Sequence, residues 1–259
     1  MIRNKESDRF LKELKAALNS SQIFQDKEDR ICYAYDASGK QYLPDLVVLP
    51  ESAQEVAAVM SLASRHGVKV IPRGAGSGLT GGALPEHGGL VMALTRFRRI
   101  LEIDSHNLTA VVEPGVVTSQ LQKAVAEKGL FYPPDPASMN YSTIGGNIAE
   151  NAGGMRAVKY GTTKDYVLGL EVILPNGEII TTGSKCVKDV VGYNLTQLFV
   201  GSEGTLGIVT KAILKLLPLP AWTKTLTVVF PSMHAAGRTV SQIITNKIVP
   251  VAMEFLDSN

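Results

Sequence analysis

A glycine-rich segment offers the clearest chemistry in this sequence, because its composition suits the binding of an anion. Residues 72–82 read PRGAGSGLTGG and follow the short apolar run 68–71. A G-x-G-x-x-G spacing begins at Gly76. Glycines let the backbone approach a phosphate closely, successive N–H groups can form an anion-binding nest, and Arg73 adds a charged donor. The segment therefore predicts a phosphate-binding loop.

The residues after this loop argue against a Rossmann fold. In a Rossmann unit the glycine loop opens a helix whose N-terminus faces the pyrophosphate. Residues 83–89 read ALPEHGG, with a proline, several turn residues and no helical periodicity. A nicotinamide-dependent Rossmann enzyme is therefore disfavoured, and the loop is expected to bind its anion without a helix behind it.

Two further glycine-rich segments point to a ligand with two ends. Residues 142–154, STIGGNIAENAGG, offer hydroxyls, amides and close-approach glycines within a stretch, 131–166, that has little periodicity. A compact domain rarely keeps so long an irregular segment without a use for it. Together with the first loop, this segment fits a dinucleotide. Residues 201–210, GSEGTLGIVT, open a strand and could bring backbone against a flat ring, although a turn with a bulge is an equal alternative.

The elements around these segments indicate an α+β protein. Residues 45–71 have a strand–helix–strand pattern with a capping box at Ser52 and Glu55, and Gly67 ends the helix. Hairpins and isolated helices follow this one βαβ unit, which excludes a regular doubly wound sheet. The other expected helices cover 6–19, Thr118 (as the N-cap) to Lys128, and a segment capped by Ser232; the other expected strands cover 90–94, 100–103, 108–112, 169–174, 179–182, 208–216, 226–230 and 251–256.

Composition bounds the class of protein. The chain has 259 residues and a formal net charge of +2, so nothing favours nucleic acid or an anionic membrane as the main partner. The two cysteines, Cys32 and Cys186, lie far apart, which disfavours a disulfide framework and favours a reducing compartment. No apolar run is long enough to span a bilayer, and the charged N-terminus lacks a signal-peptide core.

Six blocks in a fixed order resemble the FAD-dependent 2-hydroxy-acid dehydrogenases. This is the group of the glycolate oxidase D subunit and the FAD-linked D-lactate dehydrogenases, within the vanillyl-alcohol-oxidase/p-cresol-methylhydroxylase (PCMH) flavoprotein superfamily. The blocks are 72–85, 111–116, 129–138, 142–154, 159–180 and 192–218. The resemblance implies a PCMH-type FAD-binding domain of two α+β subdomains. It also implies an N-terminal helical arm over 1–35, the FAD-binding domain over 36–218, and the incomplete start of a substrate-binding cap over 219–259.

The resemblance also implies which residues hold FAD. The loop at 74–78 is expected to take the pyrophosphate, and the 142–154 and 201–210 segments to line the rest of the cofactor. Ser77 stands where relatives with a histidine-linked flavin carry the histidine, so FAD is expected to be non-covalent. The implied cofactor-binding residues are Arg73, Gly74, Ala75, Gly76, Ser77, Gly78, Leu79, Pro136, Ser138, Thr143, Gly145, Gly146, Asn147, Asn151, Gly153, Gly204, Gly207 and Ile208.

Two departures from the family pattern bear on the chemistry. Asn194 replaces the usual aspartate, and the family's histidine motif H-x-G-D-G-N-x-H is absent from the sequence. In the family this motif belongs to the cap, where a metal and histidines are thought to hold the hydroxy acid. No catalytic residue and no metal ligand are therefore assigned in this chain.

The expected function is the FAD-binding part of an oxidoreductase that oxidises glycolate or D-lactate by hydride transfer to flavin. The alternative is a non-catalytic FAD-binding or electron-transfer subunit of a larger complex. The expected partners are a small 2-hydroxy acid in the complete enzyme and an iron–sulfur or second flavin subunit, with no nucleic acid and no transmembrane segment. The expected location is the cytoplasm, with peripheral attachment to the inner membrane face as a variant.

Overall fold

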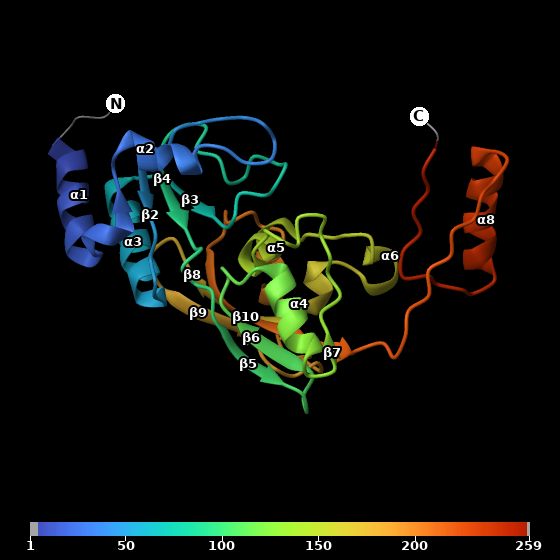
Figure 1. Cartoon of the computed structure of the whole chain (residues 1–259). Coiled ribbons are helices and arrows are strands. Elements are labelled where there is room, and N and C mark those ends of the chain that lie inside the picture. The colour runs from blue at the N-terminus through green and yellow to red at the C-terminus, as the bar shows by residue number, and fades with distance from the viewer. Residues whose placement is uncertain (1–4, 258–259) are drawn as a thin grey trace.

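The body of the protein contains a four-stranded and a five-stranded β-sheet, each with its own helices (Figure 1). The structure is a computed structural model that describes residues 5–257. The first sheet has the strand order β1 (Ile23–Phe24), β2 (Leu46–Val48), β4 (Leu90–Ala93) and β3 (Val70–Arg73). Strands β2, β4 and β3 are parallel, whereas β1 runs antiparallel to β2.

The first sheet is covered on one face by two helices whose apolar sides form a common core. α3 (Ala53–His66) begins at Ser52, whose Oγ accepts from Glu55 N at 3.2 Å, and ends at Gly67 in the left-handed region. α1 (Lys5–Ala17) packs on α3 through Phe10 and Leu14, so the predicted N-terminal arm lies against this sheet. The short helices η1 (Ser20–Gln22), α2 (Lys27–Arg30) and η2 (Ile31–Tyr33) lead from α1 toward β2.

The second sheet is antiparallel throughout. Its order is β5 (Ile100–Asp104), β6 (Thr109–Val112), β10 (Ile208–Lys215), β8 (Val167–Ile173) and β9 (Ile179–Gly183). Along β10 buried and half-buried residues alternate, as expected for a strand with one face on a core. The helical segments of this subdomain are α4 (Thr118–Ala126), α5 (Ile144–Glu150), α6 (Ala157–Tyr160), η3 (Thr163–Tyr166) and α7 (Leu195–Phe199).

The two subdomains share apolar residues at their junction. Ile173 at the end of β8 and Ile208 at the start of β10 belong to the core of the first subdomain. The second core lies between its sheet and the helices α4 and α5, and it includes Leu121, Ile144 and Ile148. This arrangement confirms the predicted α+β class and the two subdomains. The boundaries at residues 35 and 218 stay predictions.

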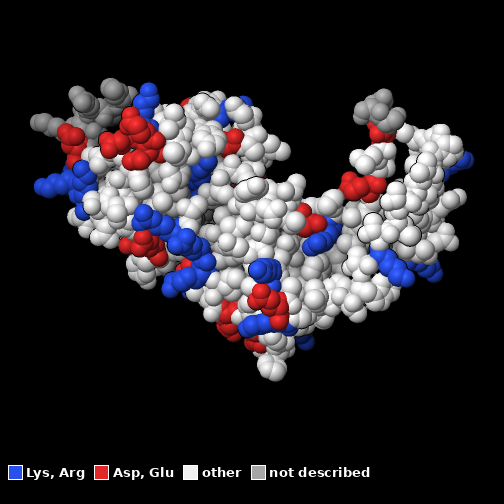
Figure 2. All heavy atoms as spheres, viewed as in Figure 1, with Lys and Arg blue, Asp and Glu red and all other residues white. Residues whose placement is uncertain are grey.

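The segment after residue 218 differs from its prediction. A short ribbon of β7 (Leu130–Phe131) and β11 (Leu217–Pro218) closes the second subdomain, and α8 (Met233–Thr245) stands apart from the body (Figure 1). Figure 2 shows an open hollow between this segment and the body. The predicted helix capped by Ser232 is present. The strands predicted at 226–230 and 251–256 are wrong, because these apolar stretches have no strand beside them to pair with and stay exposed.

Two local predictions in the body are also corrected. The N-cap of α4 is Val117, not Thr118, because the Thr118 hydroxyl is drawn into a buried polar cluster instead. Residues 144–150, expected as irregular backbone, form α5, which is capped by Thr143. No helix within residues 5–257 is both long enough and apolar enough to cross a membrane.

Candidate cofactor-binding site

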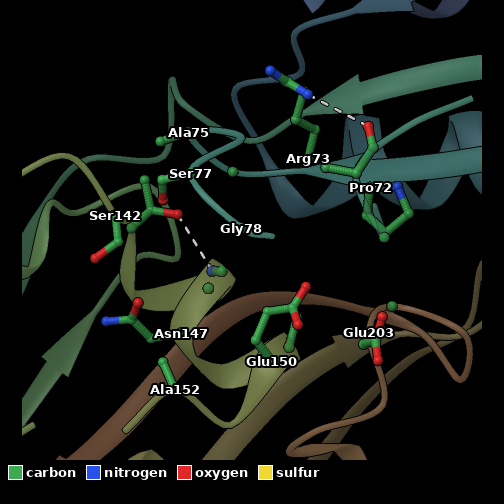
Figure 3. A pocket seen from close by; sticks show the side chains of 18 of the residues that line it. Pro72, Arg73, Ala75, Ser77, Gly78, Ser142, Asn147, Glu150, Ala152 and Glu203 are labelled. Atoms are coloured by element: carbon green, nitrogen blue, oxygen red, sulfur yellow. Dashed lines mark hydrogen bonds between the residues drawn. The ribbon is translucent and has the colours of Figure 1, made fainter. Parts of the chain in front are cut away.

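A cavity of about 380 Å³ lies where the two subdomains meet, and all three glycine-rich segments line it (Figure 3). The first wall is the loop that follows β3, the second is α5 with the residues before it, and the third is the segment that leads into β10. Its volume is in the range of small-molecule binding sites. The sequence therefore predicted correctly that these three distant segments meet in one place.

The first loop presents a row of free backbone donors. Within the described residues, the N–H groups of residues 74–80 donate no hydrogen bond. Gly76 has a φ of +69°, a conformation that L side chains rarely adopt. As predicted, residues 74–89 form turns and bends without a helix. Free N–H groups on a turning backbone are the feature that binds phosphate oxygens in a nest.

The Arg73 side chain packs against this loop and fixes its path. Its side chain is buried, and its guanidinium donates to Tyr35 O at 2.6 Å and to Ala83 O at 3.5 Å. A Cβ on Gly76 would overlap this guanidinium, so the glycine lets the loop cross over it. The predicted role of Arg73 as a direct phosphate donor stays a prediction. Its observed contacts fix the path of the loop.

The backbone N–H groups at the start of the second segment already have acceptors within the protein. Its glycines therefore serve for close packing of the backbone and not for anion binding. Ile144 N donates to Val116 O at 2.8 Å, Gly145 N to Pro114 O at 2.7 Å, and Gly146 N to Thr143 Oγ1 at 3.3 Å. A Cβ on Gly145 would lie 2.5 Å from Pro114 Cβ. The glycines of α5 thus let the helix start against a neighbouring chain segment.

A buried polar cluster fixes the start of α5. Asn147, 2% exposed, donates from Nδ2 to Thr118 Oγ1 at 2.7 Å. Thr118 Oγ1 in turn lies 3.0 Å from Ser142 O and 2.9 Å from Ser142 Oγ. Buried polar atoms need such partners, so this cluster ties α4 to α5 and to the cavity wall. Sequence reasoning missed the part of Thr118, because its spacing was read as a helix cap.

The third segment docks onto the C-terminal end of α5. Gly201 N donates to Ile148 O and Glu203 N to Ala149 O, both at 2.9 Å. A Cβ on Gly204 would overlap Pro72. Strand β10 has a register shift between Val209 and Lys211, as the alternative of a turn with a bulge predicts, whereas contact of this segment with a flat ring stays a prediction. The segment is therefore both a bulged turn and a wall of the cavity.

The structure brings most of the predicted residues to this cavity. Three do not line it: the Asn151 side chain accepts from Thr162 and Lys164, and Pro136 and Gly153 lie just outside. The predicted residues that do line it are Arg73, Gly74, Ala75, Gly76, Ser77, Gly78, Leu79, Ser138, Thr143, Gly145, Gly146, Asn147, Gly204, Gly207 and Ile208. Their contact with a cofactor stays a prediction.

Acidic residues of the cavity were missed by sequence reasoning. Asp36, Glu150 and Glu203 line it, and each is a single charge without a motif of its own. Burial raises the pKa of Glu150, and the nearby carboxylates of Glu203 and Asp36 raise it further, against a hydrogen bond from Thr80 that lowers it. In Figure 3 the Glu150 side chain rises from α5 toward the first loop.

The departure at Asn194 has a structural explanation. Asn194 is the N-cap of α7, and its Oδ1 accepts from Gln197 N at 3.0 Å. Asparagine and aspartate cap helices about equally well, so the replacement keeps the cap and removes one charge. No histidine within residues 5–257 lines the cavity, and no metal-binding group of His, Cys, Asp or Glu occurs there.

The class of protein follows from comparison with known families. Residues 44–183 match the family described as FAD binding domain, and residues 219–259 match the family of FAD linked oxidases, C-terminal domain. The chain belongs to the FAD binding domain family. Its cofactor is FAD, as the sequence predicted.

Among curated proteins, the chain is similar to the glycolate oxidase subunit GlcD of Bacillus subtilis (strain 168). The identity is 56% over 229 residues, which is 88% of this chain and 49% of that protein. It is also 42% identical to the D-lactate dehydrogenase of Anaerostipes hadrus, over 83% of this chain and 45% of that one. The chain thus spans about half the length of these curated relatives.

Solved structures share the fold. An alkyldihydroxyacetonephosphate synthase matches 94% of this chain and 50% of its own with a TM-score of 0.82 at 29% identity. A p-cresol methylhydroxylase matches 93% of this chain and 49% of its own with a TM-score of 0.81 at 21% identity. These matches confirm the predicted PCMH-type fold.

The residues present fit FAD on two observations. The free N–H groups of residues 74–80 suit a pyrophosphate, which carries negative charge and only acceptor oxygens. Beside them, the glycines of α5 and of the third segment allow the backbone to approach a ligand closely, although Glu150 and Glu203 of the same two segments also line the cavity. The free backbone donors and the close-approach glycines are therefore the features that suit this cofactor.

The close contact between Gly74 and Thr143 is expected to contribute to the free energy of unfolding, because it joins the two subdomains. In Gly74→Ala the new Cβ would overlap Thr143 Oγ1, and overpacking of this kind costs about 1–3 kcal/mol of unfolding free energy. Thr143→Ala alone should cost about 1 kcal/mol through loss of the helix cap. Urea unfolding of both single variants and the double variant measures their coupling. We expect the double variant to lose less than the sum, because Thr143→Ala removes the Oγ1 that the new Cβ would overlap.

Gly78→Ala is the matched control in the same loop. A Cβ there would meet Glu150 Oε1 at 3.6 Å, an ordinary contact, so the unfolding free energy should change little. Strictly additive losses in the Gly74 and Thr143 pair would contradict the proposed close packing.

The raised pKa of Glu150 predicts a pH-dependent stability. Because its folded-state pKa lies above the ordinary carboxyl value, ionised Glu150 lowers stability. This cost is absent below the ordinary carboxyl pKa and grows as pH rises through the raised one. Glu150→Gln should therefore be more stable than the parent near neutral pH and indistinguishable from it near pH ~4. Chemical unfolding across this pH range measures the difference.

The exposed Glu178 provides a control with the same loss of charge, and Glu178→Gln should show no such divergence with pH. A constant difference between Glu150→Gln and the parent at every pH would argue against the raised pKa.

Proposed function

We propose that this chain is the FAD-binding part of an oxidoreductase that oxidises a 2-hydroxy acid, with glycolate and D-lactate as the first candidates. The observation that carries the proposal is the row of free N–H groups at residues 74–80, which shares a cavity with two glycine-lined walls. The names of the two curated relatives, glycolate oxidase subunit and D-lactate dehydrogenase, support the substrate class. They do not favour the alternative of a non-catalytic subunit.

In this proposal the chain's residues position the cofactor. The N–H groups of 74–80 hold the pyrophosphate, the Thr143 cap and the Asn147 cluster keep α5 against it, and Gly204 and Gly207 leave room for the remainder. When bound, FAD supplies the hydride acceptor for oxidation of the hydroxyl-bearing carbon. The hydroxyl proton must pass to a general base. No described residue is assigned that task, and we infer that it belongs to the C-terminal domain whose family matches residues 219–259.

We further infer that FAD is held without a covalent bond and that the electrons pass to a partner subunit. Ser77 lines the cavity but offers no ring nitrogen for a histidine-type flavin bond. The relative from B. subtilis is named as a subunit, which supports a complex with other chains. An iron–sulfur or second flavin subunit is the partner expected from the sequence.

Purified protein is expected to bind FAD reversibly. Incubation with FAD should give the yellow flavin spectrum, and denaturation followed by filtration should release the flavin into the filtrate. Gly76→Ala should weaken binding about tenfold or more, because it strains the loop at positive φ and meets Arg73. Gly129→Ala carries a similar strain at the end of α4, outside the cavity, and should bind FAD normally. Protein that stays colourless would refute the proposal.

The substrate class can be tested on the flavin itself. Under anaerobic conditions glycolate or D-lactate is expected to bleach the flavin of the natural, full-length protein. Ethylene glycol, which lacks the carboxylate, should leave the flavin oxidised. An unbleached flavin with every 2-hydroxy acid tried, in a protein that does bind FAD, would favour the non-catalytic alternative.

A further inference from the structure

The cavity proposed to bind an anionic cofactor is itself acidic. Of the described residues that line it, the charged ones are Asp36, Glu150 and Glu203 against Arg73. The guanidinium of Arg73 is already engaged with the carbonyls of Tyr35 and Ala83. A pyrophosphate would therefore add negative charge to a lining that carries an excess of carboxylates, and like charges in a partly buried site repel strongly.

Glu150 and Glu203 converge on the first loop from two different segments. Glu150 Oε1 accepts from Thr80 Oγ1 at 2.9 Å. A Cβ on Gly82 would lie 2.9 Å from Glu203 Oε2 and 3.4 Å from Glu150 Oε1, so both carboxylates reach the same point beside the loop. In Figure 3 the two side chains lie on the same side of the loop, and the Arg73 guanidinium points away from them.

The backbone fixes this pair in place. Glu203 has a φ of +52°, which is uncommon for a residue with a side chain, and its N–H is bonded to Ala149 O at 2.9 Å, next to Glu150. Neither carboxylate forms an ion pair with a described residue. The backbone segments that carry the two carboxylates are therefore joined at the same end of α5.

Asp36 adds a third carboxylate from the segment after η2. It is 7% exposed, its Oδ1 accepts from Ser38, and its Oδ2 has no partner among the described residues. The groups that face Glu150 are thus Glu203 and Asp36, both anionic, and the Thr80 hydroxyl. Arg73 is the cation among the described lining residues, and its charge interacts with that of Asp36, whereas Glu150 and Glu203 have no cationic partner among these residues.

We propose that binding of FAD is coupled to the uptake of one proton from solvent by Glu150. The inference rests on the proposed function, because it requires the pyrophosphate to enter this cavity. Proton uptake removes one negative charge where the anion arrives and turns the Glu150 carboxylate into a neutral carboxyl with an O–H donor. Burial and the two neighbouring carboxylates already raise the pKa of Glu150, and a bound anion raises it further.

Isothermal titration of the flavin-free 259-residue chain with FAD tests this coupling. Titrations in buffers with different heats of ionisation give the number of protons taken up per FAD. We expect uptake of up to one proton and an affinity that falls as pH rises, by at most about tenfold per pH unit. The sign follows because a group whose pKa rises on binding favours the complex at low pH.

Two variants and one control test whether Glu150 is the group that takes up the proton. Glu150→Gln should abolish the uptake and bind FAD more tightly than the parent at neutral pH. Glu178→Gln, at an exposed residue that does not line the cavity, should keep the parent's uptake. Thr80→Val removes the hydroxyl that stabilises the ionised form, so it should move the uptake to higher pH. This second variant tests the same group even if Glu150→Gln folds poorly.

The outcomes separate the two proposals. FAD binding without proton uptake, or uptake that persists in Glu150→Gln, would overturn the role of Glu150. Affinity that depends on Mg²⁺ and not on pH would also overturn it, since a cation would then offset the charge. Complete absence of FAD binding would instead refute the proposed function, on which this inference rests.

Discussion

The close approach of three backbone segments at the subdomain junction is the constraint on which the rest of the structure depends. Gly74 meets Thr143, Gly145 meets Pro114, and Gly204 meets Pro72, each at a distance that leaves no room for a Cβ. Side chains at Gly74 and Gly204 would push the two subdomains apart, and one at Gly145 would push α5 away from the segment after β6, because packed interiors tolerate extra atoms poorly. The cavity exists because the segments meet closely on one side and diverge on the other.

The glycine-rich segments differ in whether their backbone N–H groups are already hydrogen-bonded. The amides at the start of α5 are used to hold the helix against Pro114 and Val116, so they are not free to bind an anion. The amides of 74–80 have no such partners among the described residues. We therefore propose that anion binding falls to the loop without a helix, whereas the segment that forms a helix is a wall of the cavity. Sequence similarity between glycine-rich segments conceals this difference, because it depends on which carbonyls lie nearby.

The electrostatics of the cavity differ from what a phosphate site is usually assumed to be. Positive charge is scarce in its lining, and Arg73 is committed to backbone carbonyls. Attraction for an anion must come from neutral N–H dipoles, which are short-ranged, while Glu150, Glu203 and Asp36 oppose it. In our proposal, protonation of Glu150 is part of how this site balances its charge. A bound flavin would be sensitive to pH even though its own pyrophosphate stays ionised.

The sequence by itself determined the α+β class and the glycine-rich loops, because these depend on local composition and on periodicity. The order of its motifs carried the resemblance that implied the family and FAD. Most of the cofactor-binding residues that it predicted line the cavity, and they make up about half of the lining. The sequence could not show that β4 lies between β2 and β3, that 144–150 is helical, or that Thr118 belongs to a buried cluster. The strands expected near 226–230 and 251–256 failed for the same reason. Each of these features depends on residues that are distant in the chain: the neighbouring strand, the carbonyl that accepts from the first turn of a helix, or the second carboxylate of a pair. Only the tertiary structure decides which of these residues meet.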